Sequence, residues 1–180
     1  MNTSFGAALA AWHDFYALLG SGAATLIGLM FVAVTFGASL IEVATESTTR
    51  AFLDPTVTHF VQVLVTACLV LTPTIEPLPF GVLLAAIGVL RTIALIGVHR
   101  SMRSAHRENG DVELSDWMSG VIVPFAVYAG FIGCGVAFSL GHTAFGALAI
   151  ATVAALLNGI YGAWELMLWL ALRRSRSPRQ

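Results

Sequence analysis

Residues 117–164 form a stretch of 48 residues that contains no Asp, Glu, Lys or Arg. As one continuous helix this stretch would rise about 72 Å, whereas a transmembrane helix needs about 20 apolar residues to cross about 30 Å of hydrocarbon. The stretch is therefore long enough for two crossings. We place the turn between them at Gly141 and His142, which gives predicted spans at 117–140 and 143–172.

The composition of the whole chain is typical of a membrane protein. Of the 180 residues, 57% are hydrophobic and 11% are charged, and the mean hydropathy is +0.83. Soluble domains contain about 45–50% apolar and about 25% charged residues. The nine basic residues are all arginines and form no general basic face, so nucleic acid is not an expected partner. The expected partner is the lipid bilayer.

Three further apolar runs precede the long uncharged stretch. The second opens with Asp54 and Pro55, which predicts a helix N-cap followed by proline at the first helical position. The prediction is an all-α, polytopic integral membrane bundle in one domain. Its five predicted transmembrane helices cover residues 15–41, 55–75, 80–99, 117–140 and 143–172, with a cytosolic loop at 100–116 and a basic cytosolic tail at 173–180.

The arginines predict the orientation of this bundle. Eight of the nine lie in the first loop, the third loop and the C-terminal tail, which five crossings place on one side of the membrane. The N-terminus and the two remaining turns contain no Lys or Arg. By the positive-inside rule, we expect the N-terminus outside and the C-terminus in the cytosol.

Arg91 is the arginine that falls inside a predicted span. It lies eight residues before His99, and Glu165 lies eight residues before Arg173, so both are about 12 Å from the inner ends of their spans. An arginine near the centre of a bilayer costs about 2.5–3.5 kcal/mol, and pairing with a carboxylate is a common remedy. We therefore expect an ion pair between Arg91 and Glu165. The alternative is that the long Arg91 side chain extends to the membrane interface.

Further polar residues are expected at the same depth. Those on the fifth span are spaced at i, i+3 and i+7, which places them on one helix face. The predicted polar intramembrane layer consists of Arg91, Glu165, His59, Gln62, Thr35, Asn158 and Tyr161.

This layer has two interpretations. In the structural one, an ion pair and its hydrogen-bonding neighbours fix the register of the helices. In the functional one, the layer is a wetted site for a small anion, a proton or a polar solute. Arg91 would then recognise the ligand, Glu165 would be its counter-ion or a proton acceptor, and His59 would titrate near neutral pH.

Small residues recur at helical spacing in two spans. Gly20, Ala24 and Gly28 form a small-xxx-small pattern in the first span, and Gly130 and Cys134 form a similar pair in the fourth. This pattern lets two helix backbones approach closely in lipid. The contact is either between helices of one chain or between subunits of a homo-oligomer.

The segment WHDFYALLGSGAATLIGLMFVAV, residues 12–34, carries aromatic residues, then small residues, then G-L-x-F-V-A. It resembles the first span of small polytopic bacterial inner-membrane proteins to which no activity is assigned. The resemblance covers this span alone. It implies a multi-pass location in the bacterial cytoplasmic membrane and implies nothing about mechanism.

No catalytic motif accompanies these features. The sequence contains no G-x-S-x-G, H-E-x-x-H or P-loop pattern, so we expect no enzyme activity, no cofactor and no metal. The favoured prediction is a channel or transporter subunit for a small ion or polar solute, with the polar layer as its site. The alternative is a noncatalytic membrane partner, scaffold or regulator of another membrane protein.

Overall fold

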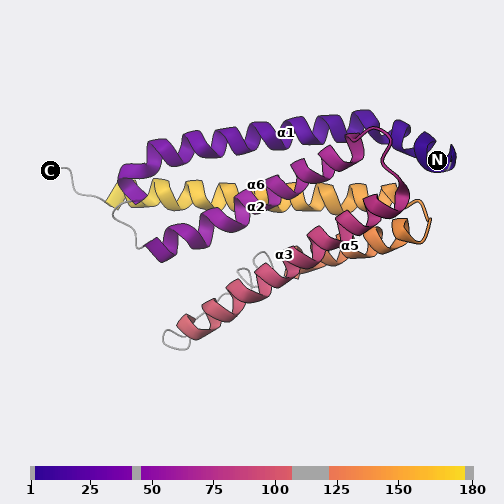
Figure 1. Cartoon of the computed structure of the whole chain (residues 1–180). Coiled ribbons are helices and arrows are strands. Elements are labelled where there is room, and N and C mark those ends of the chain that lie inside the picture. The colour runs from indigo at the N-terminus through magenta and orange to yellow at the C-terminus, as the bar shows by residue number, and fades with distance from the viewer. Residues whose placement is uncertain (1–2, 42–45, 107–121, 177–180) are drawn as a thin grey trace.

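The computed structural model describes residues 3–41, 46–106 and 122–176, and these ranges are helical with short turns and no strand. The helices are α1 (Thr3–Ile41), α2 (Glu46–Leu71), α3 (Pro77–His106), α5 (Val123–Ser139) and α6 (Phe145–Arg176). They run alternately in opposite directions. The N-terminus, the α2–α3 turn and the α5–α6 turn consequently lie at one end of the bundle (Figure 1).

The helices are not arranged as a closed ring. Helices α2 and α6 pack against each other in the middle, α1 lies along both on one side, and α5 packs against α6 on the other. Helix α3 packs along α5 and forms the outer edge of the bundle, away from α1 (Figure 1). Although α2 and α3 follow each other in sequence, each is therefore held mainly by other helices.

Three helical segments in the described part of the chain are long and apolar enough to cross a membrane. They are Phe5–Phe36, Pro77–Gly97 and Phe145–Glu165. Two shorter apolar helical segments, Thr56–Leu71 and Val123–Ser139, lie between them in sequence. The chain is therefore an all-helical protein with the composition and helix lengths of a membrane protein.

The first two helices begin earlier than the predicted spans. The predicted first span begins after Asp14, but helix α1 already begins at Thr3. Asp14 is exposed on the surface of this helix, so its charge does not interrupt it. Helix α2 begins at Glu46, so the predicted N-cap at Asp54 is wrong and Pro55 lies inside the helix. A proline removes a single N–H donor, and helices in membrane proteins tolerate this loss.

Proline and glycine determine the turns at the opposite end. Helix α2 ends at Leu71, since the residue before Pro73 is restricted to extended backbone, and α3 begins directly with Pro77. Gly141 has a φ of +83° and follows α5 in a Schellman motif. Its N–H donates to the carbonyl of Phe138 at 2.9 Å, and the N–H of His142 donates to Ala137 at 2.9 Å. Residues 117–121 of the predicted fourth span lie outside the described residues.

Aromatic rings close the bundle at the end that carries these turns. Phe80 and Phe138 pack edge to face with centroids 4.9 Å apart, and Phe138 and Phe145 do the same at 4.9 Å. Phe5 from the start of α1 packs against this group, 5.8 Å from Phe80. Each of the four rings is 5% exposed or less. The first turns of α1, which precede the predicted first span, therefore belong to the core.

Helices α3 and α5 approach each other through their main chains. A Cβ atom built on Gly135 would lie 2.6 Å from the amide nitrogen of Ala85 and 2.6 Å from the carbonyl oxygen of Gly81. A Cβ on Gly88 would lie 2.8 Å from the side chain of Ile132. At Gly135 no side chain larger than hydrogen fits without movement of the helices, whereas at Gly88 the side chain of Ile132 would have to shift.

We predict that Gly135→Ala lowers the free energy of unfolding by about 1–3 kcal/mol, the usual cost of overpacking. Gly133→Ala is the matched control, because it lies on the same helix with nothing within 4 Å of its Cβ position. The control should keep or raise stability, since alanine favours a helix over glycine by about 1 kcal/mol. Thermal unfolding in detergent, followed by far-UV circular dichroism, measures both; equal destabilisation would contradict the prediction.

Candidate functional site

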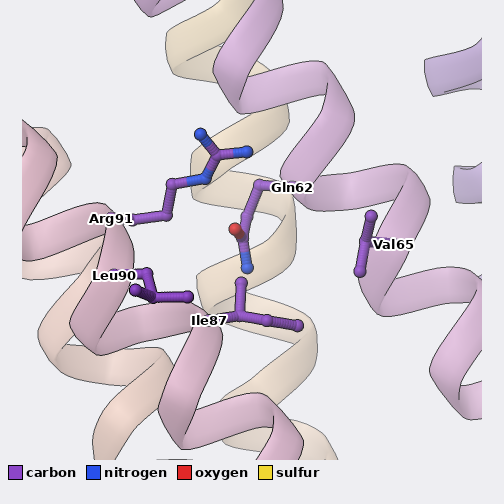
Figure 2. Close-up of a pocket in the computed structure, with 5 residues that line it drawn as sticks. All are labelled: Gln62, Val65, Ile87, Leu90 and Arg91. Carbon is purple, nitrogen blue, oxygen red and sulfur yellow. The ribbon is translucent and has the colours of Figure 1, made fainter.

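A groove with a volume of about 290 Å³ lies between α2 and α3. Gln62 and Val65 line it from α2, and Ile87, Leu90 and Arg91 line it from α3 (Figure 2). Residues 87, 90 and 91 lie on a different face of α3 from Gly81, Ala85 and Gly88, which contact α5. The face of α3 that is not used in packing against α5 is therefore the one that faces α2 across this groove.

Gln62 is the buried polar side chain of the groove. Only 1% of the residue is exposed, yet neither Oε1 nor Nε2 has a hydrogen-bond partner within the described part of the chain. The side chain extends from α2 toward Ile87 on α3 (Figure 2). A buried amide without partners costs about 1–3 kcal/mol. Hydrogen bonding between the described helices therefore does not account for the buried Gln62 side chain.

Arg91 is partly buried and extends from α3 toward α2, next to Gln62 (Figure 2). Its guanidinium carries a permanent positive charge and five N–H donors. The groove therefore combines a cation with an uncommitted amide, and its remaining lining is apolar.

The predicted ion pair between Arg91 and Glu165 is absent. Among the described residues the structure records a single ion pair, between His13 and Asp14 at 3.0 Å, on the surface of α1. Arg91 is on α3, which packs against α5, whereas Glu165 is on α6, and α6 packs against α2, α5 and α1. Equal depth along two helices does not bring side chains together when the helices are not neighbours on those faces.

A second group of polar residues forms a satisfied contact beside the groove. The Nδ2 atom of Asn158 on α6 donates to Nε2 of His59 on α2 at 3.2 Å. The His59 ring is 2% exposed and stacks on Tyr128, with centroids 5.9 Å apart. This group connects α2, α5 and α6. The predicted layer thus divides into a structural part around His59 and an open part around Gln62 and Arg91.

Two glycines of α6 make room for the structural part. A Cβ on Gly159 would lie 2.8 Å from the ring of Phe60, and a Cβ on Gly162 would lie 2.6 Å from Oγ1 of Thr56. Sequence reasoning missed these positions and Tyr128. The signal was present in the spacing of Gly159 and Gly162 beside Asn158, but it did not indicate which helix would pack there.

The other predicted layer residues lie apart from the groove. Thr35 is exposed on α1, where its hydroxyl donates to the carbonyl of Phe31 at 2.8 Å. Tyr161 and Glu165 lie on α6, with Tyr161 exposed and Glu165 partly exposed. Neither Thr35 nor Tyr161 nor Glu165 lines the groove.

The small residues predicted to mediate helix packing have different environments. A Cβ on Gly20 would meet Cβ of Ala67 on α2 at 2.8 Å, whereas Ala24 and Gly28 are exposed. On α5, a Cβ on Gly130 would lie 3.4 Å from Ala151 of α6, and Cys134 is buried. In the α1 pattern, therefore, Gly20 packs against another helix of the chain, whereas Ala24 and Gly28 do not.

The chemistry of the groove is that of binding. The part of the chain that the structure describes contains no group of three or more His, Cys, Asp or Glu side chains able to hold a metal ion. Arg91 offers donors and positive charge, and Gln62 offers both a donor and an acceptor. This combination fits a small polar or negatively charged group. No protein-family model, curated protein or solved structure matches the chain.

We predict opposite effects on stability for the two polar parts. Gln62→Met, which keeps the size of the side chain, should raise the free energy of unfolding by about 1–2 kcal/mol because it removes an unsatisfied buried amide. Asn158→Leu should lower it by about 0.6–1.7 kcal/mol because it removes an interhelical hydrogen bond. Unfolding in detergent without added ligand is the measurement. A loss of stability in Gln62→Met would indicate that the amide is structural.

We also predict that Arg91 and Glu165 act independently. In a double-mutant cycle of Arg91→Leu and Glu165→Leu, the coupling free energy should be below about 0.5 kcal/mol, the limit expected for sites without contact. The cycle is measured by unfolding of the monomer in dilute detergent. A coupling free energy of 1 kcal/mol or more, on the order seen for contacting pairs, would show that Arg91 and Glu165 do form an ion pair.

Proposed function

We propose that the protein is a small integral membrane protein that acts as a channel or transporter subunit, with the α2–α3 groove as its binding site for a small ion or polar solute. One observation carries this proposal: the buried amide of Gln62 lacks hydrogen-bond partners in the described part of the chain, and Gln62 lines the same groove as Arg91. A noncatalytic solute site is the role that this pair of groups supports best.

The energetic cost of this arrangement supports a binding role. An amide and a guanidinium inside a bundle are expected to be paired, since membrane helices otherwise bear several kcal/mol for each unsatisfied group. The neighbouring His59 and Asn158 follow this rule. Among the described residues, Gln62 and Arg91 do not pair with a carboxylate or with each other, and a bound solute or water would satisfy them.

The proposed placement in the membrane has five spanning helices, with the N-terminus outside and the C-terminus in the cytosol. The alternating helix directions support it, because they put the arginine-free turns at one end of the bundle and Arg100 and Arg103, near the end of α3, toward the other. The proposed location is the bacterial cytoplasmic membrane, and the proposed assembly is a homo-oligomer.

A second candidate function is that of a membrane partner or regulator of another protein. The observation in its favour is the outer face of α1, where Ala24 and Gly28 are exposed and no atom lies within 4 Å of a Cβ built on Gly28. In this role the groove between α2 and α3 would contain neither water nor ligand. Access of water to the groove distinguishes the two candidates.

We predict that a cysteine at position 62 reacts with charged, membrane-impermeant thiol reagents in lipid vesicles. The background is Cys68→Ser, Cys134→Ala, and the test variant adds Gln62→Cys. Ile93→Cys is the matched control, because Ile93 is on α3 and 60% exposed on its outer surface, where lipid would surround it. Position 62 should react at least about tenfold faster than position 93, since the thiolate forms only in contact with water. Equally slow reaction at both positions would favour the partner role.

A further inference from the structure

The opening of the groove is apolar, whereas its interior is polar. Leu90 and Val65 flank it and are 66% and 36% exposed, and Ile87 is partly buried beside them. Gln62 is buried, and Arg91 is partly buried at the other side (Figure 2). A ligand that satisfies both regions has a charged end and an apolar remainder.

The polar groups specify the chemistry of the charged end. Arg91 presents N–H donors and a positive charge, which favour a carboxylate or phosphate. The Nε2 atom of Gln62 is a further donor, and its Oε1 accepts from a hydroxyl or a protonated oxygen of the same head group. With no carboxylate of the described chain bound to Arg91, an oxyanion from outside is the complementary partner.

The position of the groove specifies the route of entry, and this step rests on the proposed function. Because Leu90 and Val65, which flank the groove, are exposed, the groove opens on the outer surface of the bundle between α2 and α3. In the proposed membrane placement this opening is at the depth of Arg91, about 12 Å from the inner end of the span. A small ion or solute reaches the groove only along the wetted path that the proposed function requires. A lipid-like anion already has its tail in the hydrocarbon layer at this depth.

We propose that the α2–α3 groove binds an amphipathic oxyanion, with its carboxylate or phosphate on Arg91 and Gln62 and its hydrocarbon chain along Val65, Ile87 and Leu90. The volume of about 290 Å³ is at the small end of ligand pockets, which span about 300–1,000 Å³. It fits one head group and the first part of a single chain. The rest of the chain lies between the helices and the bilayer.

The experiment is photo-crosslinking of the full chain in nanodiscs of phosphatidylcholine. The probe is a hexadecanoic acid with a diazirine in its tail, and mass spectrometry identifies the labelled residues. We expect labels on Val65, Ile87 or Leu90 that excess oleate and hexadecyl phosphate remove. Acetate and inorganic phosphate, which carry the same head groups without a tail, should leave the labels in place.

Two substitutions test the polar contacts. Arg91→Gln should reduce labelling at least about tenfold, the effect of losing one charge-assisted contact. Gln62→Met should reduce it while leaving the protein folded, which guards against a variant that simply fails to fold. Glu165→Gln is the matched control on α6 and should label like the wild type.

Each other outcome overturns the inference in a defined way. Labelling that survives Arg91→Gln shows nonspecific lipid contact. Labelling that acetate or inorganic phosphate removes as well as oleate shows a site for water-borne anions, and the proposed function then stands. A loss in Glu165→Gln equal to that in Arg91→Gln shows that labelling does not depend on the groove, because Glu165 does not line it. If no label is found but a cysteine at position 62 reacts with the charged thiol reagents, only the amphipathic ligand is refuted. If the cysteine at position 62 does not react, the proposed function is refuted.

Discussion

The main-chain contact between α3 and α5 determines how the rest of the bundle is arranged. Gly81 and Gly135 bring the two backbones so close that no methyl group fits between them. One face of α3 is thereby committed to α5, and the face with Arg91 points to α2. Because α2 is held in turn by α1 and α6, neither helix moves in to close the space between them. The groove is a consequence of two strong contacts made elsewhere.

The helical segments were predictable from the sequence, but their neighbours were not. Hydrophobicity and helical rise are properties of position along the chain, so they located the helical segments. Which helix lies beside which, and how each is rotated about its axis, depends on packing in three dimensions. Glu165 was therefore predicted to pair with Arg91 from its position along the chain, although it lies on α6 and forms no ion pair with Arg91 in the described part of the chain. Asp14 and Asp54 misled for a related reason, since a charge ends an apolar run without ending a helix.

The candidate site shows the same division between what is local and what is not. Polar residues in apolar runs drew attention to His59, Gln62 and Asn158, because such residues are rare inside membrane proteins. The sequence did not reveal that Asn158 satisfies His59 while Gln62 is left without a partner. Small-residue spacing was equally ambiguous. Gly20 is packed against α2, but Gly28 in the same pattern has no neighbour within the described chain.

The short connection between α2 and α3 gives the groove a mechanical property. Residues 72–76 join the two helices, and Arg91 lies 14 residues beyond Pro77, about 21 Å along the helix axis. This connection is therefore the pivot about which α3 can tilt relative to α2. A tilt of about 5° at the pivot displaces the guanidinium by about 2 Å, the difference between a hydrogen bond and none. Because α5 shares its backbone contact with α3, the two helices would tilt together, and a small rotation at the α2–α3 connection would change the separation of Arg91 and Gln62.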